Sequence, residues 1–348
     1  MMVNRRGLTL GAAAVMVLSA VLGAQKKDDK KQSDAQRKET LDIVKLADGA
    51  AAGQPMTNDF NLAWAHEDYL KATGNKEYVP FTLTYDASKI TTPGVALYWR
   101  VVPKDAAAPA PAAAPAKKDD KDKDKKASAK YPYEDINFIM PGTGRLSRAF
   151  TVGAGTYDVY VILREQASTA KNAPAAKVSM IKQTLTVPDF WSAELTTSSV
   201  IVASRIEPLQ APLSPNEQAE RPYALGAMEV VPALDSKFTT KQELSIFMLI
   251  YNPKTDPMNK PDVSVEYNFY QKPAGAAEKF FNKTSPQDLN GKTLPAAFDM
   301  SLGHQLQTGQ AVPLASFPAG DYRLEIKVTD KLAMKTVTRD VNFTVTAG

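Results

Sequence analysis

Two short stretches of this chain repeat one pattern: "GAGTYDVYVIL" at residues 153–163 and "PAGDYRLEIKV" at residues 318–328. In each stretch a glycine stands two residues before a tyrosine, and apolar residues then follow at every second position. Alternation with a period of two is typical of a strand that buries one face. The repeat therefore predicts the same structural unit in each half of the chain.

The glycine and the tyrosine of each stretch predict a structural corner. Gly155 and Gly320 permit a backbone bend that other residues resist. Tyr157 and Tyr322 are placed to bury their rings and to return their hydroxyls to upstream backbone groups, as in the tyrosine corner of Greek-key sandwiches. We therefore assign these four residues a structural role rather than a chemical one.

Period-two alternation continues through both halves and predicts an all-β fold. The second half offers no long amphipathic helix, which a parallel crossover would need, so antiparallel pairing is favoured. Pro80 removes a ladder donor and predicts that its strand lies at a sheet edge. The alternating residues are Val79, Phe81, Leu83 and Tyr85; Val95, Leu97, Trp99 and Val101; Tyr157, Val159, Val161 and Leu163; Leu244, Ile246, Met248 and Ile250; Val263, Val265, Tyr267 and Phe269; and Tyr322, Leu324, Ile326 and Val328.

At the repeated glycine–tyrosine stretches the chain resembles bacterial immunoglobulin-like β-sandwich modules, which end in an alternating strand such as "VNFTVT" at residues 341–346. The second half resembles the C-terminal sandwich domains of large secreted bacterial proteins. The resemblance implies two tandem immunoglobulin-like antiparallel β-sandwiches. It leaves the function open, because this architecture hosts adhesion, chaperone, enzyme-accessory and binding roles.

The N-terminus predicts export. Residues 1–24 contain Arg5 and Arg6, an apolar stretch and then small residues, which is the pattern of a secretory signal peptide and indicates a periplasmic or extracellular protein. A retained membrane anchor is the alternative, although the apolar stretch is short for a bilayer.

The rest of the chain divides into three parts. Residues 25–55 read as a charged linker and a short helix, with Leu41, Val44 and Ala47 on one face. Residues 56–188 predict the first sandwich and residues 189–348 the second. Residues 104–130, rich in Ala, Pro, Lys and Asp, predict a disordered insert within a hairpin of the first sandwich.

The charge of the chain is confined to its polar segments. The net charge is +4, and loss of Arg5 and Arg6 would leave +2. Residues 26–40 hold six basic and four acidic side chains, and residues 104–130 hold eight basic and five acidic side chains. The rest of the chain after residue 24 is therefore slightly acidic. This distribution does not suit nucleic acid.

The sequence offers no chemical motif with the required spacing. The chain has no Cys, which excludes disulfides and thiolate sites, and its two His residues lack a partner at zinc-binding spacing. His66 precedes Glu67 and Asp68, but adjacent side chains diverge, so we expect His66 to be a surface residue. We predict no cofactor and no metal.

Aromatic residues give the remaining candidates. Tyr98, Tyr131 and Tyr133 are candidates for stacking on a ligand. Phe190 and Trp191 lie at the expected boundary between the sandwiches and predict a domain junction.

Three functional hypotheses follow. The leading one is a non-enzymatic periplasmic or secreted binding or scaffolding protein that engages another envelope protein through sandwich loops or strand edges. A carbohydrate-binding module that uses the three tyrosines is the alternative. A hydrolase with an unrecognised carboxylate site is a minor alternative.

Overall fold

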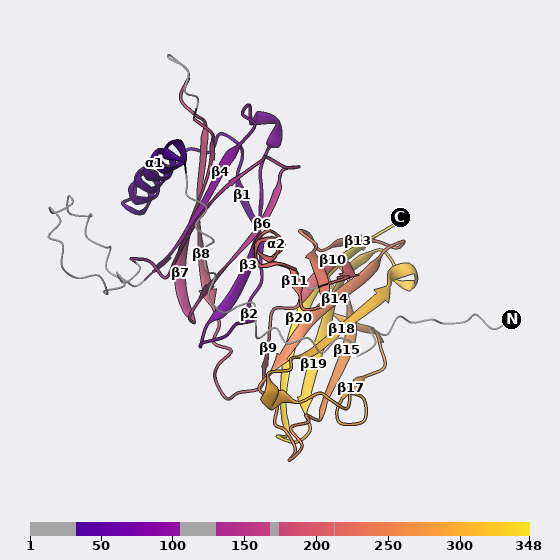
Figure 1. The fold of residues 1–348 in the computed structure, drawn as a ribbon. Coiled ribbons are helices and arrows are strands. Elements are labelled where there is room, and N and C mark those ends of the chain that lie inside the picture. The colour runs from indigo at the N-terminus through magenta and orange to yellow at the C-terminus, as the bar shows by residue number, and fades with distance from the viewer. Residues whose placement is uncertain (1–32, 105–129, 168–173, 212) are drawn as a thin grey trace, which may run out of the picture.

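The computed structural model describes residues 33–104, 130–167, 174–211 and 213–348. The predicted signal peptide, most of the predicted insert and residues 25–32 lie outside this range. The described chain is mostly strand, arranged as four sheets in two sandwiches (Figure 1). The all-β prediction is confirmed.

The first sandwich consists of sheets A and B. In sheet B the strands β1 and β2 line one edge of β3, and β6 pairs with its other edge. Sheet A contains, in spatial order, β5 (Tyr133–Ile139), β4 (Val95–Pro103), β7 (Gly155–Glu165) and β8 (Val178–Val187). Sheet B contains β1 (Ala63–Glu67), β2 (Leu70–Lys71), β3 (Glu77–Thr84) and β6 (Arg145–Val152), and the short helix η2 (Ala87–Lys89) follows β3.

The second sandwich consists of sheets C and D, in which only β13 pairs in parallel among the described strands. Sheet C contains, in order, β11 (Ala224–Leu225), β12 (Met228–Pro232), β10 (Ile201–Pro208), β14 (Glu243–Tyr251) and β18 (Leu306–Pro313), with β9 (Thr196–Thr197) also on β14. Sheet D contains β13 (Lys237–Thr239), β20 (Lys335–Thr346), β19 (Gly320–Asp330), β15 (Val263–Lys272) and β16 (Lys279–Lys283), with β17 (Gln287–Leu289) also on β15. Short helices α2 (Pro215–Glu220), η3 (Met300–Leu302) and η4 (Leu314–Ser316) lie in the connections.

Each sandwich buries the alternating residues that define its strands. In β14, for example, Leu244, Ile246, Met248 and Ile250 point into the core of the second sandwich. In β4, Val95, Leu97, Trp99 and Val101 point into the core of the first. The period of two thus places one face of every long strand against the opposite sheet.

The repeated glycine–tyrosine stretch forms the same corner in both sandwiches. The Tyr157 hydroxyl donates to the Gly153 carbonyl oxygen at 3.0 Å, and the Tyr322 hydroxyl donates to the Pro318 carbonyl oxygen at 2.7 Å. Gly155 and Gly320 have φ values of 149° and 153°, a region that side chains disfavour. In each corner, a buried tyrosine hydroxyl thus supplies the hydrogen bond that a backbone carbonyl oxygen needs.

Helix α1 (Asp34–Ala51) covers the outer face of sheet A (Figure 1). A capping box formed by Ser33 and Gln36 starts the helix within the charged segment that the sequence predicted as linker. Its buried face is Glu39, Ile43 and Ala47, which fits the i, i+4 spacing of a helix. The predicted face was therefore wrong in one member, because Leu41 is 62% exposed.

Strand β3 is central in sheet B, so the prediction that Pro80 marks an edge strand was wrong. Pro80 lies where the neighbouring strand is interrupted between β1 and β2. The amide of Asp68 donates to the Pro80 carbonyl oxygen at 3.0 Å, but proline has no N–H to return the second bond of an antiparallel pair. The missing donor is thus accommodated by a break in the facing strand.

The segment 104–130 joins two adjacent strands of sheet A. Strands β4 and β5 pair antiparallel from Val95 with Ile139 to Val101 with Tyr133. Every pair of this ladder is formed by residues outside the segment 104–130.

Replacing residues 105–129 with a short Gly-Ser linker should therefore leave the fold intact. Because loop-closure entropy changes slowly with length, we expect the melting temperature to shift by less than about 3 °C. Differential scanning calorimetry of the purified variant tests this, and a large drop would show that the segment contributes to the core.

The corners give a second prediction. Tyr322→Phe keeps the ring but leaves the Pro318 carbonyl without its donor, which should lower the free energy of unfolding by about 1 kcal/mol. Tyr322→Ala also removes the buried ring and should cost about 4 kcal/mol. Urea denaturation measures both, with Tyr157→Phe as the parallel test in the first sandwich. A Tyr322→Phe variant as stable as the parent chain would refute the role given to the hydroxyl.

Candidate functional site

The outer face of sheet B packs against the outer face of sheet C, and this contact is the junction between the sandwiches. Both faces contribute apolar side chains, which form one buried cluster. The members from the first sandwich are Leu70, Ala72 and Tyr78, and those from the second include Ile201, Tyr223, Val230, Phe247, Leu249 and Tyr251. The junction is therefore a core of its own rather than a flexible linker.

Hydrogen bonds cross the junction around this cluster. The Tyr78 hydroxyl donates to the Pro222 carbonyl oxygen at 3.0 Å, and the Lys71 amide donates to the Tyr251 hydroxyl at 3.0 Å. The amide of Tyr69 donates to Ser199 Oγ at 2.9 Å. Each bond pairs a polar group of one sandwich with a polar group of the other, which helps to fix their relative orientation.

Phe190 and Trp191 lie at the junction and contribute to it in different ways. Phe190 is buried, with its ring 5.1 Å from that of Tyr251, and its amide donates to Glu77 Oε1 at 3.1 Å. Trp191 is half-exposed and donates from Nε1 to the Lys76 carbonyl oxygen at 3.0 Å.

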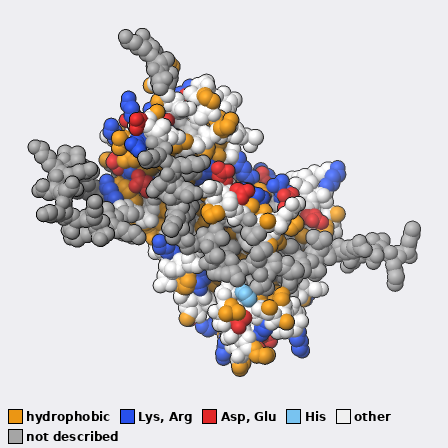
Figure 2. Space-filling view, in the orientation of Figure 1, with side chains coloured by type: hydrophobic (Ala, Val, Ile, Leu, Met, Phe, Trp, Pro, Cys, Tyr) orange, Lys and Arg blue, Asp and Glu red, His pale blue; other side chains and the backbone are white. Residues whose placement is uncertain are grey.

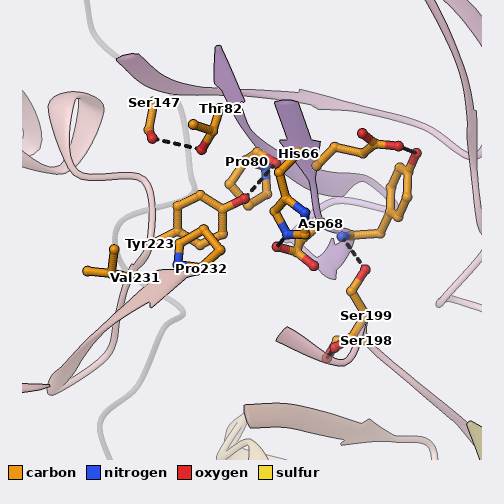
Figure 3. A network of polar contacts seen from close by, with 12 residues as sticks. His66, Asp68, Pro80, Thr82, Ser147, Ser198, Ser199, Tyr223, Val231 and Pro232 are labelled. Atoms are coloured by element: carbon orange, nitrogen blue, oxygen red, sulfur yellow. Dashed lines mark hydrogen bonds and ion pairs between the residues drawn. The ribbon is translucent and has the colours of Figure 1, made fainter. Parts of the chain in front are cut away.

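A histidine–carboxylate pair lies beside the break at Pro80 (Figure 3). His66 Nε2 is 2.8 Å from Asp68 Oδ2, and Asp68 is almost completely buried. The Tyr223 hydroxyl reaches across from sheet C and donates to the Pro80 carbonyl oxygen at 3.4 Å. The Asp68 carboxylate is thus buried next to the second sandwich, whereas His66 remains partly exposed.

The surroundings of His66 and Asp68 favour the protonated form of each side chain. Burial by itself lowers the pKa of His66, but the hydrogen bond to Asp68 and the negative charges of Asp68 and Glu67 outweigh it, so the pKa is raised above its usual value. Burial also raises the pKa of Asp68, against the opposing effect of His66. The pair therefore holds a proton more tightly than the same groups do in the unfolded chain.

The nearby serines are engaged with backbone groups. Ser198 Oγ accepts from the Leu249 amide at 2.9 Å and donates to the Ser199 carbonyl oxygen at 2.7 Å. Ser199 Oγ accepts from the Tyr69 amide. The Ser198 bonds lie within the second sandwich, and the Ser199 bond crosses the junction. Neither hydroxyl is hydrogen-bonded to the imidazole, as a nucleophile activated by that histidine would be.

The three predicted stacking tyrosines are engaged in the first sandwich. Tyr98 lies beneath helix α1 and donates to Glu134 Oε1 at 2.5 Å. Tyr131 is buried with its ring 4.1 Å from the Arg100 guanidinium, and Tyr133 is half-buried and stacks on Trp99 at 6.2 Å. Tyr98 and Tyr131 are therefore buried within the first sandwich, and Tyr133 keeps part of its surface exposed.

Arg100 ties the C-terminal end of helix α1 to sheet A. Its buried guanidinium donates to Asp48 Oδ1 at 2.6 Å, to the Tyr131 hydroxyl at 3.1 Å and to Glu134 Oε1 at 3.2 Å. The carboxylates of Asp48 and Glu134 compensate the buried positive charge of Arg100, so this cluster holds helix α1 on sheet A.

The outer face of sheet D is the second candidate site. Phe280 on β16 is 58% exposed, and its ring meets that of Tyr270 edge-on at 5.8 Å. The Arg323 guanidinium stacks on Tyr270 at 4.5 Å and is held by Glu278 at 2.9 Å and Asp340 at 2.6 Å. An ordered row of aromatic and arginine side chains is the composition typical of protein-binding hot spots.

Sequence reasoning missed two of these features. His66 was expected at the surface, yet its side chain is only 27% exposed and it is paired with Asp68. The sequence alone does not determine which of the adjacent rings Phe280 and Phe281 is exposed, because the choice depends on a bulge between β15 and β16. A usable signal exists only for the junction: "IFMLIY" at residues 246–251 is continuously apolar, which indicates burial on both faces.

In the described part of the chain, no helix is both long and apolar enough to cross a bilayer. The same residues contain no group of three or more His, Asp or Glu side chains arranged to hold a metal ion. Positive and negative side chains are interspersed over the face seen in Figure 2.

Comparisons with known proteins match neither a protein-family model nor a curated protein. Among solved structures, dimeric latent PorU from Porphyromonas gingivalis is similar with a TM-score of 0.28 and 9% identity, over 86% of this chain and 21% of that one. Native α2-macroglobulin from E. coli gives 0.21 and 10%, over 85% and 15%. A family 123 glycoside hydrolase from Clostridium perfringens gives 0.21 and 12%, over 32% and 23%. This chain covers less than a quarter of each of these chains, and similarities this distant do not identify a function.

The His66–Asp68 pair makes the stability of the junction depend on pH. Because the folded state raises the pKa of His66, folding takes up a proton between the ordinary histidine pKa of about 6.5 and the raised value. The free energy of unfolding should therefore fall as pH rises above about 6.5. Urea denaturation between pH 5.5 and 8.5 measures the slope.

His66→Gln should remove this part of the slope, whereas His304→Gln, at the other histidine of the chain, should retain it. His304 is a suitable control because it lies in the second sandwich and accepts from the Asp299 amide at Nδ1. Equal slopes in the parent chain and His66→Gln would contradict the assignment.

Proposed function

We propose that this chain is a non-enzymatic binding or scaffolding protein of the bacterial periplasm or extracellular space. It engages another protein through the outer face of sheet D. The export part of the proposal rests on the signal-like pattern of residues 1–24. The binding part rests on how the sheets are covered.

Three of the four sheets have covered outer faces. Helix α1 packs on sheet A, and sheets B and C cover one another. In sheet D the central strands β15 and β19 present polar and charged side chains outward, and no other described element forms an apolar cluster on that face. Sheet D is therefore the sheet with a face available to a partner.

The exposed ring of Phe280 on that face is the observation that carries the proposal. Single exposed apolar side chains are common, but Phe280 belongs to an ordered group with Tyr270 and Arg323 on one sheet face. Phe280 is held in place by Tyr270, which Arg323 holds in turn. Such a pre-ordered ring loses little entropy on binding.

Site-specific photocrosslinking tests the proposal. A photoreactive phenylalanine analogue at position 280 should crosslink to a protein in an envelope extract of the producing organism. The matched control is position 41, because Leu41 is 62% exposed against 58% for Phe280 but lies on helix α1. Phe280→Ala together with Tyr270→Ala should lower capture of the crosslinked protein about tenfold.

The proposal fails if position 280 gives no adduct. It also fails if position 41 gives the same adduct in equal yield.

A further inference from the structure

We infer that the edge strand β16 accepts an extended acidic segment of the partner as an additional strand of sheet D. This inference rests on the proposed function and names the chemistry of the partner. It follows from three properties of β16: its place in the sheet, its attachment to the core and its charge.

Strand β16 is the terminal strand of its sheet. One edge pairs with β15, from Asn268 with Lys283 to Gln271 with Lys279. In the described ranges no strand pairs with the other edge. An edge strand of this kind presents backbone donors and acceptors that an extended segment can pair with.

The strand is attached firmly to the core. A bulge in the pairing with β15 separates the two adjacent rings, so that Phe280 faces outward and Phe281 faces the core. The Phe281 ring lies 4.8 Å from Phe317 and 5.4 Å from Tyr322, the tyrosine of the second corner. The edge is therefore held in its strand conformation before a partner arrives, which reduces the entropy lost on pairing.

The charge along the edge is positive and available. Lys279 and Lys283 are both exposed, and neither forms an ion pair with another described residue. The acidic neighbour Glu278 is taken by Arg323 at 2.9 Å. The edge therefore complements an extended segment whose side chains are acidic.

Lysines on an edge strand also have a protective role, because they discourage pairing with apolar strands of other molecules. The same charges select among partners rather than closing the edge. A neutral segment would desolvate the two lysines without compensation, and a basic segment would be repelled by them. An acidic segment instead pairs its carboxylates with Lys279 and Lys283, which precede and follow Phe280 in β16. An apolar residue of the incoming segment would then contact the Phe280 ring.

A fluorescent peptide of sequence Glu-Val-Glu-Val-Glu-Val-Glu is the probe, and its binding to the full chain is measured by fluorescence anisotropy. A Lys-Val-Lys-Val-Lys-Val-Lys peptide is the charge control. An acidic peptide that is N-methylated at residues 2–7 is the backbone control, since neither of its edges keeps a peptide N–H donor for strand pairing. We expect the acidic peptide to bind at least about tenfold more tightly than either control.

Variants place the binding on β16. Lys279→Glu with Lys283→Glu should weaken acidic-peptide binding about tenfold or more, whereas Lys241→Glu with Lys254→Glu, two exposed lysines outside β16, should change it less than about twofold. Circular dichroism confirms that each variant is folded. The inference is overturned if the acidic peptide binds no better than the basic peptide, or if the N-methylated peptide binds equally well. It is also overturned if the two double variants behave alike.

The outcome separates this inference from the proposed function. A crosslink at position 280 without preference for the acidic peptide would leave the binding face in place and refute strand addition. Absence of the crosslink at position 280 would refute the proposed function itself.

Discussion

The structure depends on the burial of sheet B against sheet C. Strand β14 illustrates the constraint, because Leu244 and Ile246 face its own sandwich while Phe247 and Leu249 face the other one. A strand that is apolar on both faces cannot be left at a surface. The relative orientation of the two sandwiches therefore follows from the burial of these faces against one another.

The polar network at the junction has its origin in one proline. Pro80 cannot donate to the strand that faces it, so that strand divides into β1 and β2 around Asp68. The break turns Asp68 toward the second sandwich, where burial would penalise its charge unless a partner supplied a proton or a hydrogen bond. His66 is that partner, on β1 two residues before Asp68. An interruption of the sheet thus leads directly to a titratable pair inside the junction.

The sequence was informative about which residues face inward and uninformative about what covers the other side. Alternation identified the core residues of β14 and β19, and the glycine–tyrosine stretch predicted both corners, because these features depend on local geometry. Tyr98 faces outward as alternation requires, yet helix α1 covers it, and that contact joins residues far apart in the chain. His66 and Phe280 were missed for the same reason, since a strand break and a bulge depend on the register of the partner strand.

The two corners are alike in geometry but differ in what they support. Tyr157 packs within the core of the first sandwich and returns its hydroxyl to Gly153. Tyr322 does the same with Pro318, and its ring also belongs to an aromatic cluster with Phe281, Phe317 and Phe343. Because Phe281 belongs to β16, the second corner holds the edge strand whose outward ring is Phe280. A device that closes a sandwich therefore also orders the surface from which, in our proposal, the protein binds its partner.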